Sequence, residues 1–198
     1  MTRNQRSGIE KVKRIIENVE GWLQEKEGEF LYRMAKKVSG EHAIIEIGSW
    51  KGKSTICLAL GSKAGNKAKV YAIDPHSGPL HREIYGEVWT LEDFKSNICS
   101  AGCEDIVVPI VKTSEEVAEG WNKPIEFLFI DGAHEYKFVK LDFELWHPHL
   151  IEGGVIAFHD TTGDQSEGPK RVVEEFIFNS RNFRDIGFID SIAFATKA

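Results

Sequence analysis

An apolar run that ends in a glycine-bearing turn constrains this chain more than any other stretch. Residues 43–47 (AIIEI) are long enough for a buried strand and too short for a helix. Gly48 and Gly52 lie in the turn, and residues 55–60 resume an apolar pattern that is compatible with a helix. The glycines would allow unusual backbone angles and close approach of a ligand. A strand, a turn and a helix N-terminus together predict a ligand site, because free backbone N–H groups there favour an anion.

Three sequence patterns compete for this turn. The dinucleotide fingerprint fails, because Ser49 and Trp50 follow Gly48 and no third glycine has the right offset. The phosphate loop would end as Gly52-Lys53-Ser54 does, but it needs one more residue between its two glycines. The third pattern, acidic-x-Gly-x-x-x-Gly after a first strand, resembles motif I of class I methyltransferases that depend on S-adenosylmethionine (SAM). In that family the turn receives the amino-acid part of SAM.

Composition limits the classes of function. The 198 residues suffice for one domain with a full hydrophobic core. With 31 acidic and 25 basic residues, the net charge of −6 argues against broad nucleic-acid binding, which needs a basic face. The three cysteines form no metal-type pairs and are expected to be reduced thiols in a cytoplasmic protein. No apolar segment reaches membrane-spanning length and no signal-peptide core is found, so no membrane contact is expected.

The order of periodic segments predicts an α/β fold. Residues 1–40 have apolar residues at helical spacing and are expected to form a helical cap beside one domain over residues 41–198. Strands are predicted at residues 43–47, 68–73, 106–111, 125–130 and 155–158, with residues 150–154 as a turn. Helices between these strands imply a Rossmann-like, doubly wound parallel sheet. Residues 183–189 and 191–195 are predicted to close the sheet as an antiparallel hairpin.

Polar residues follow several of the predicted strands. Asp74 ends the second strand and suits the ribose of a nucleoside, because a carboxylate can accept from both hydroxyls. An Asp that caps a loop before proline is the alternative. Asp131 follows the fourth strand, and His159 and Asp160 follow the fifth. The carboxyl ends of parallel strands meet at one edge, so these side chains are predicted to surround one ligand site with the Gly48 turn.

At this level of detail the chain resembles one branch of the class I SAM-dependent methyltransferases. It is similar to the macrocin O-methyltransferase and cephalosporin-hydroxylase-like group over residues from about 43 to 180. The motifs, in order and at about the family spacing, are GSWKGKST, AIDPHSG, WTLEDFKSNI, FLFIDGAHEYKFVKLDFELWHPHLIEGGVIAFHDT and GPKRVVEEF. The resemblance implies a seven-stranded sheet whose last strand is antiparallel, in agreement with the predicted hairpin.

The resemblance also implies that SAM is the cofactor. Glu46, Gly48 and Ser49 correspond to the residues at its methionine end. Asp74 corresponds to the residue that holds the ribose, and residues 113–114 flank the adenine. The expected SAM-binding residues are Glu46, Gly48, Ser49, Trp50, Gly52, Ser54, Asp74, Thr113, Ser114 and Asp131.

Metal-dependent relatives coordinate a divalent cation through an Asp after strand four and an acidic pair after strand five. Asp131 and Asp160 match this pattern, and His159 stands where an acidic residue is often found. The histidine weakens the case for Mg²⁺ and leaves Mn²⁺, Zn²⁺ or no metal open. His134 and His159 lie at strand ends, and either could be the base, with Asp131 as the third expected catalytic residue. The alternative for each histidine is an orienting or packing role.

Methyl transfer from a sulfonium needs a positioned acceptor, and a hydroxyl acceptor must also lose its proton. The resemblance therefore implies O-methylation of a hydroxyl on a small molecule or sugar. The loops at residues 78–89 and 163–168 are expected to shape the acceptor pocket. Two alternatives remain: a phosphoryl-transfer module built on Gly52-Lys53-Ser54, and a SAM-binding protein without catalysis. A homodimer is expected by analogy with helical appendages in this fold.

Overall fold

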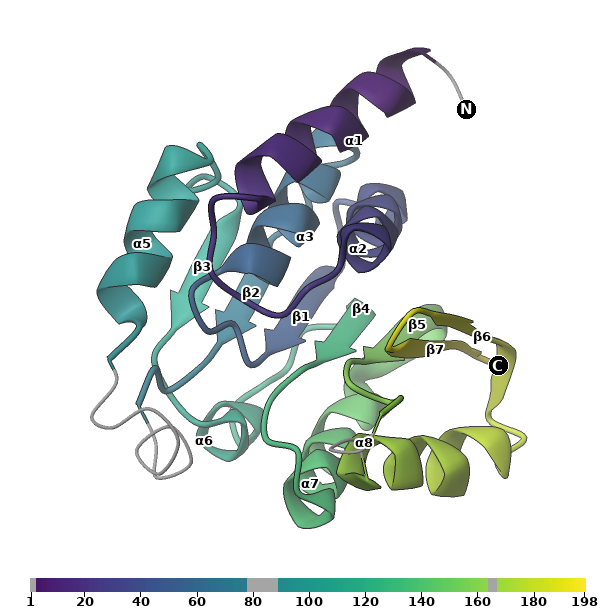
Figure 1. Cartoon of the computed structure of the whole chain (residues 1–198). Helices are drawn as coiled ribbons and strands as arrows, with labels where there is room; N and C mark the ends of the chain where they lie inside the picture. Colours follow the sequence, from purple (N-terminus) through teal and green to yellow (C-terminus); the bar gives the residue numbers. More distant parts are fainter. Residues whose placement is uncertain (1–2, 78–88, 164–166) are drawn as a thin grey trace.

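The computed structural model describes residues 3–77, 89–163 and 167–198. One seven-stranded sheet lies between two layers of helices (Figure 1), and its strand order is β3-β2-β1-β4-β5-β7-β6. Strands β1 to β5 are parallel, and β7 runs antiparallel to both of its neighbours. The predicted Rossmann-like sheet with an antiparallel last strand is therefore confirmed. The strands are β1 (Ala43–Ile47), β2 (Val70–Ile73), β3 (Val107–Ile110), β4 (Ile125–Ile130), β5 (Leu150–Phe158), β6 (Phe183–Ile189) and β7 (Ile192–Lys197).

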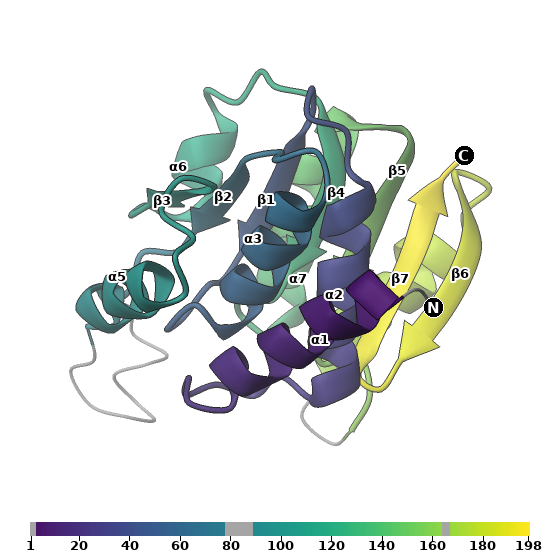
Figure 2. The same cartoon turned by 90° about the horizontal axis from the view of Figure 1, so that it is seen from above.

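Two helical layers cover the sheet. One face carries α1 (Arg3–Ile16), α2 (Glu25–Lys37), α3 (Lys53–Ala64) and α5 (Leu91–Ser100). The other face carries α6 (Ser114–Ala118), α7 (Tyr136–Trp146) and α8 (Glu167–Val172), which continues as the π-helical turn η2 (Val173–Phe178). The 3₁₀ turn η1 (His147–His149) connects α7 to β5. Figure 2 shows α2 beside α3 on this face of the sheet, with α1 crossing over them, and residues 54–62 of α3 are buried in this layer.

Side chains that alternate along the strands pack into two hydrophobic cores, one on each face of the sheet. Ile44 and Phe127 pack with the α1–α3 layer, whereas Ile45 and Leu128 pack with the α7 layer. Every residue of β1 is buried, as expected for a central parallel strand that is covered on both faces. The buried side chains of α1 and α2 belong to the same core as those of α3. The N-terminal helices therefore pack as part of this structure, and the division of the chain at residue 40 stays a prediction.

One local prediction was wrong. Residues 150–154 are the beginning of β5, since Leu150 already pairs with Ile125. The next pair is Phe127 with Val155, so β5 has extra residues that form an irregularity in the ladder. Gly153, at φ +77°, lies within this strand irregularity.

Two further expectations concern the surface of the protein. Residues 78–88 and 164–166, in the loops expected to shape the acceptor pocket, lie outside the described residues. Within the described ranges, none of the helices combines the length and the apolar composition needed to cross a membrane.

Candidate active site

The turn after β1 is closed against the end of β4. Gly48 has φ +84°, and a Cβ atom at this position would lie 2.1 Å from the carbonyl oxygen of Asp131. The Gly48 N–H donates to Ile73 O of β2, and the Asp131 N–H donates to Ile47 O of β1. Only glycine fits here, because it permits both the backbone angle and the contact between the two chain segments. In the structure, the segment that closely approaches Gly48 is the backbone of Asp131, and the approach of a ligand stays a prediction.

Asp74, at the end of β2, holds the same turn in place. Its Oδ2 accepts hydrogen bonds from the backbone N–H groups of Ser49 and Trp50, both at 2.8 Å. Its Oδ1 accepts one from the N–H of His76 at 2.6 Å. A carboxylate has about four lone-pair positions, so Oδ1 retains capacity for one hydroxyl donor. Asp74 is therefore an anchor of the turn, and its role toward ribose stays a prediction.

Glu46 lies inside the protein behind this turn. Its Oε2 accepts a hydrogen bond from the hydroxyl of Thr55, on α3. Its Oε1 is also buried, and within the described part of the chain it has no hydrogen-bond partner. The same holds for the buried hydroxyl of Ser49. Burial raises the pKa of Glu46 to about 8 against hydrogen bonds with Ser54 and Thr55, which lower it, and the charges of Asp131 and Asp74 add to the rise.

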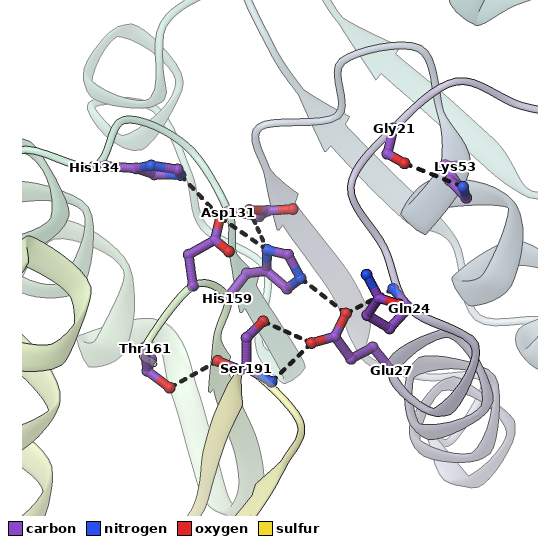
Figure 3. Close-up of polar contacts among 10 residues, drawn as sticks. Gly21, Gln24, Glu27, Lys53, Asp131, His134, His159, Thr161 and Ser191 are labelled. Carbon is purple, nitrogen blue, oxygen red and sulfur yellow. Dashed lines mark hydrogen bonds and ion pairs between the residues drawn. The ribbon is translucent and has the colours of Figure 1, made fainter. Parts of the chain in front are cut away.

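Acidic and imidazole groups gather where β4 and β5 end. Nε2 of His134 lies 3.1 Å from Oδ2 of Asp160, and Nδ1 of His159 lies 3.1 Å from Oδ1 of Asp131 (Figure 3). One ligand atom each from Asp131, His134 and Asp160 lie within 4.8 Å of one another. The hydrogen bond to Asp160 raises the pKa of His134. Burial raises the pKa of Asp131 against the opposing charge of His159.

His159 is enclosed by carboxylates on both sides of its ring. Besides Asp131, its Nδ1 lies 3.2 Å from Oδ2 of Asp160, and its Nε2 lies 3.2 Å from Oε2 of Glu27. Burial lowers the pKa of His159, but the charge of Asp131, the contacts of Nδ1 with Asp131 and Asp160, and the hydrogen bond of Nε2 with Glu27 outweigh it and raise that pKa to about 12. Carboxylates face both ring nitrogens of His159, whereas His134 contributes a ring nitrogen to the group with Asp131 and Asp160. The geometry therefore favours His134 over His159 both as a base and as a metal ligand.

Comparison with known proteins identifies the family. A model described as a methyltransferase domain matches residues 45–161, which is more than half of the chain. The chain belongs to this methyltransferase family. The match contains the turn after β1, Asp74 and the acidic residues after β4 and β5. Family and fold together place the chain among the class I SAM-dependent methyltransferases, and its macrocin-like branch stays a prediction.

The proteins that this chain resembles include one curated relative and several solved structures. The chain is 32% identical over 120 residues to the uncharacterized protein y4gI of Sinorhizobium fredii (strain NBRC 101917 / NGR234), and the match covers 60% of this chain. The chain spans only 13% of the length of that relative. It resembles the solved O-methyltransferase from Bacillus cereus in complex with S-adenosylhomocysteine (SAH), with a TM-score of 0.65, 21% identity, and coverage of 96% of this chain and 91% of the other. It also resembles the O-methyltransferase TomG from Streptomyces achromogenes in complex with SAM, with a TM-score of 0.66, 16% identity, and coverage of 100% and 91%. At these identities the likeness to the solved structures shows the fold.

The residues of this methyltransferase domain fit the methionine end of SAM. That end carries an ammonium group and a carboxylate. Oε1 of Glu46 is a buried acceptor that could take the ammonium, and the Ser49 hydroxyl is a buried group that could donate to the carboxylate. Buried polar groups of this kind are normally hydrogen-bonded, so their lack of partners among the described residues is consistent with a ligand.

A divalent cation also fits the residues present. Asp131, His134 and Asp160 offer two carboxylate oxygens and one imidazole nitrogen, a donor set that suits Mn²⁺ or Zn²⁺ better than Mg²⁺. The structure brings together Asp131 and Asp160 as the sequence predicted, because β4 and β5 are neighbours. His134 takes the place in this group that the sequence analysis gave to His159.

Other predicted binding residues have local partners. Thr113 is the N-cap of α6 and exchanges hydrogen bonds with Glu116, while Ser114 accepts a hydrogen bond from Trp146 Nε1 at 2.7 Å. Gly52 is the N-cap of α3, with Ser54 buried in the first turn of that helix. The ring of Trp50 lies 5.8 Å from the ring of Trp22. Contacts of these residues with SAM stay a prediction.

Sequence reasoning missed Glu27, which is fully buried on α2 and reaches His159 from the N-terminal segment. One signal was present in the sequence. Glu27 comes four residues after Leu23 and three before Phe30, so it lies on the apolar face of the predicted helix. A charged residue on such a face needs a buried partner, but the sequence does not say which one.

Proposed function

We propose that this domain transfers the methyl group of SAM to a hydroxyl oxygen of a small molecule or sugar. The observation that carries the proposal is the group Asp131, His134 and Asp160 beside the turn that fits SAM. Such a group supplies what a hydroxyl acceptor needs beyond a methyl donor, namely a place to bind and a way to lose its proton. Two solved structures with this fold are named O-methyltransferases, which supports the same reaction.

The chain contributes mainly by positioning. When bound, SAM supplies a methyl group on a positively charged sulfur, and in-line displacement by the acceptor oxygen leaves SAH. Glu46 and Ser49 would fix the methionine end, so the methyl group would be held at the edge where β4 ends. Because displacement requires donor and acceptor in line, such fixation accounts for much of the rate.

The acceptor proton has two routes. Asp131, His134 and Asp160 would hold a divalent ion, whose Lewis acidity would make the acceptor hydroxyl easier to deprotonate. Without an ion, His134 receives the proton, with Asp160 accepting the hydrogen bond that orients its ring. We favour the metal route, because three ligands of suitable chemistry converge there. His159 takes neither role in this proposal, because carboxylates face both of its ring nitrogens.

The test combines binding and turnover. Calorimetry should detect SAH binding in the micromolar range and no binding of ATP. Methyl-labelled SAM should then transfer label to a member of a panel of catechols, hydroxylated small molecules and nucleotide sugars. Clear ATP binding without SAH binding would favour the phosphoryl-transfer alternative. SAH binding without transfer to any acceptor class would favour a SAM-binding protein without catalysis.

The phosphoryl-transfer alternative has weaker support. Nζ of Lys53 donates to the carbonyl oxygen of Gly21 at 3.1 Å, so this lysine is directed to the segment between α1 and α2 (Figure 3). A phosphate loop needs its lysine free to reach phosphate oxygens. The contact with Gly21 would have to break before Lys53 could do so.

We also propose a cytoplasmic homodimer that does not bind nucleic acid. The net charge of −6 supports the last point, because nucleic-acid binding needs a basic face. Analogy with related folds supports the dimer. Analytical ultracentrifugation checks it, and a monomer at high concentration would contradict the dimer without affecting the proposed reaction.

A further inference from the structure

Glu27 connects the N-terminal segment to the carboxyl ends of the sheet. Its carboxylate is completely buried and accepts four hydrogen bonds from three segments of the chain (Figure 3). Oε2 accepts from Gln24 N at 2.8 Å and from Nε2 of His159 at 3.2 Å. Oε1 accepts from the backbone N–H of Ser191 at 2.9 Å and from its hydroxyl at 2.6 Å. Both oxygens are therefore held in one orientation.

This fixed carboxylate determines how the ring of His159 lies. An imidazole attached at one end can rotate, and its two nitrogens are interchanged by a flip. With Nε2 bonded to Glu27, Nδ1 is directed between Asp131 and Asp160, at 3.1 and 3.2 Å from their oxygens. Those two carboxylates belong to the group proposed to meet the acceptor or an ion. Glu27 thus contacts His159, and His159 in turn contacts Asp131 and Asp160.

A purely structural role explains less of this geometry. Gln24 and Glu27 form the N-terminal cap of α2, but a helix cap works equally well at the surface. Burying a charge is costly unless hydrogen bonds and an opposite charge compensate for it. Here the opposite charge comes from His159, whose other nitrogen faces Asp131 and Asp160.

We propose that Glu27 is a positioning residue of the active site, which acts through His159 to set the orientation of Asp131 and Asp160. The inference rests on the proposed function, since it takes those aspartates to serve the acceptor. It implies that α2, a helix from the N-terminal segment that lies outside the matched residues 45–161, completes the site. Comparable partners of metal-site residues typically change metal affinity or activity by about 10- to 100-fold when they are lost.

The test uses Glu27→Gln. Both oxygens of Glu27 accept hydrogen bonds, so the amide nitrogen of a glutamine would face another donor in either orientation and lose those bonds. The chain offers a matched control at the other end of β4. Glu126 also accepts from a serine N–H (Ser39, 2.9 Å), the same serine's hydroxyl (2.7 Å) and a histidine (His42 Nδ1, 3.1 Å). All three contacts go to Oε2, so Glu126→Gln removes the charge of a Glu–Ser–His group away from the proposed site while its amide oxygen can still accept.

Three readouts separate positioning from stability. In ¹⁵N-histidine-labelled full-length protein, Glu27→Gln should shift the side-chain signals of His159, which are assigned by their loss in His159→Gln. Mn²⁺ affinity, measured by titration with the metal alone, should fall by roughly tenfold or more. Once an acceptor is known, kcat should fall by a similar factor, while the Kd for SAH stays within about twofold. Glu126→Gln should leave all three readouts at wild-type values.

The outcomes decide between the two roles. Wild-type His159 signals in folded Glu27→Gln protein would overturn the proposal, and so would equal effects of Glu27→Gln and Glu126→Gln. If Glu27→Gln does not fold, Glu27→Asp, which keeps the charge but shortens the side chain, is judged by the same signals. Wild-type protein without SAH binding or methyl transfer would instead contradict the proposed function, while the His159 signals still report on positioning by Glu27.

Discussion

Gly48 and Asp131 contact each other through their backbones, at the point where β1 and β4 leave the sheet. A methyl group on Gly48 would lie 2.1 Å from the Asp131 carbonyl oxygen, well inside the distance that two atoms tolerate. The contact joins the turn that fits SAM to the aspartate of the proposed acceptor site. Backbone contacts therefore hold the turn and Asp131 together, and their short distance is possible because Gly48 has no side chain.

The first prediction concerns this contact. Gly48→Ala should lower the free energy of unfolding by more than about 4 kcal/mol, or prevent folding, because it adds a backbone overlap to the strain of a left-handed residue. Gly153→Ala is the matched control, since Gly153 has φ +77° but no atoms within 4 Å of the added methyl. It should cost only about 1–2 kcal/mol. Urea unfolding measures both, and equal losses would show that the contact with Asp131 is unimportant.

The second prediction concerns Asp74. Asp74→Ala removes the acceptor for the N–H groups of Ser49, Trp50 and His76. Each buried donor left without a partner costs about 1–3 kcal/mol, so both the unfolding midpoint and SAH affinity should fall. Asp74→Asn keeps one oxygen that can accept from the turn, so it should lose less stability. An unchanged unfolding midpoint in Asp74→Ala would show that the turn does not depend on this carboxylate.

The third prediction concerns pH and Glu46. Its pKa rises from 4.5 to about 8 on burial, so the folded protein keeps a proton that the unfolded chain releases. The Glu46 contribution therefore favours folding less as pH rises through that window, by no more than about 1.4 kcal/mol per pH unit. Glu46→Gln should lack this decline, since its amide does not titrate. Urea unfolding of both proteins between about pH 5 and pH 8 measures the difference, and parallel stability profiles would contradict the assignment.

The same residue links pH to ligand binding. An ammonium group beside Glu46 favours the ionised carboxylate, so SAH should bind more tightly as pH approaches the pKa of about 8 and should release a proton on binding. Calorimetry in two buffers of different ionisation enthalpy counts the released protons. Glu46→Gln should bind SAH more weakly and release fewer protons, and equal proton release by both proteins would place the ammonium elsewhere.

The fourth prediction concerns the metal. Chelation should abolish methyl transfer while SAH binding survives, and Asp131→Asn and Asp160→Asn should each reproduce that result. Asp160 has φ +51°, and Asp185, at φ +52°, is a matched control for backbone effects because Asn tolerates this conformation as Asp does. Asp185→Asn should be fully active. Full activity of the wild type with a strong chelator would exclude the metal route, and His134→Ala should then remove the acidic limb of the pH–rate profile.

The sequence by itself determined the secondary structure and the edge of the sheet that carries the site. Short apolar runs became β1 and β4, and the polar residues that follow them became neighbours, because parallel strands all end at one edge. That rule predicted the proximity of Asp131 and Asp160 without any knowledge of side-chain positions. The start of β5 was predicted too late, because a segment with glycines can form either a turn or a strand irregularity.

Only the tertiary structure decided what each polar group faces. The sequence pattern allowed either His134 or His159 to be the base, yet in the described structure His159 is enclosed by three carboxylates, whereas His134 forms its ion pair with Asp160. The third carboxylate, Glu27, lies 132 residues away in the chain and arrives because α2 packs on α3. Periodicity reports which face of a helix is buried, but the partner across that face depends on how distant segments pack. For that physical reason the roles of the two histidines could not be separated before the fold was known.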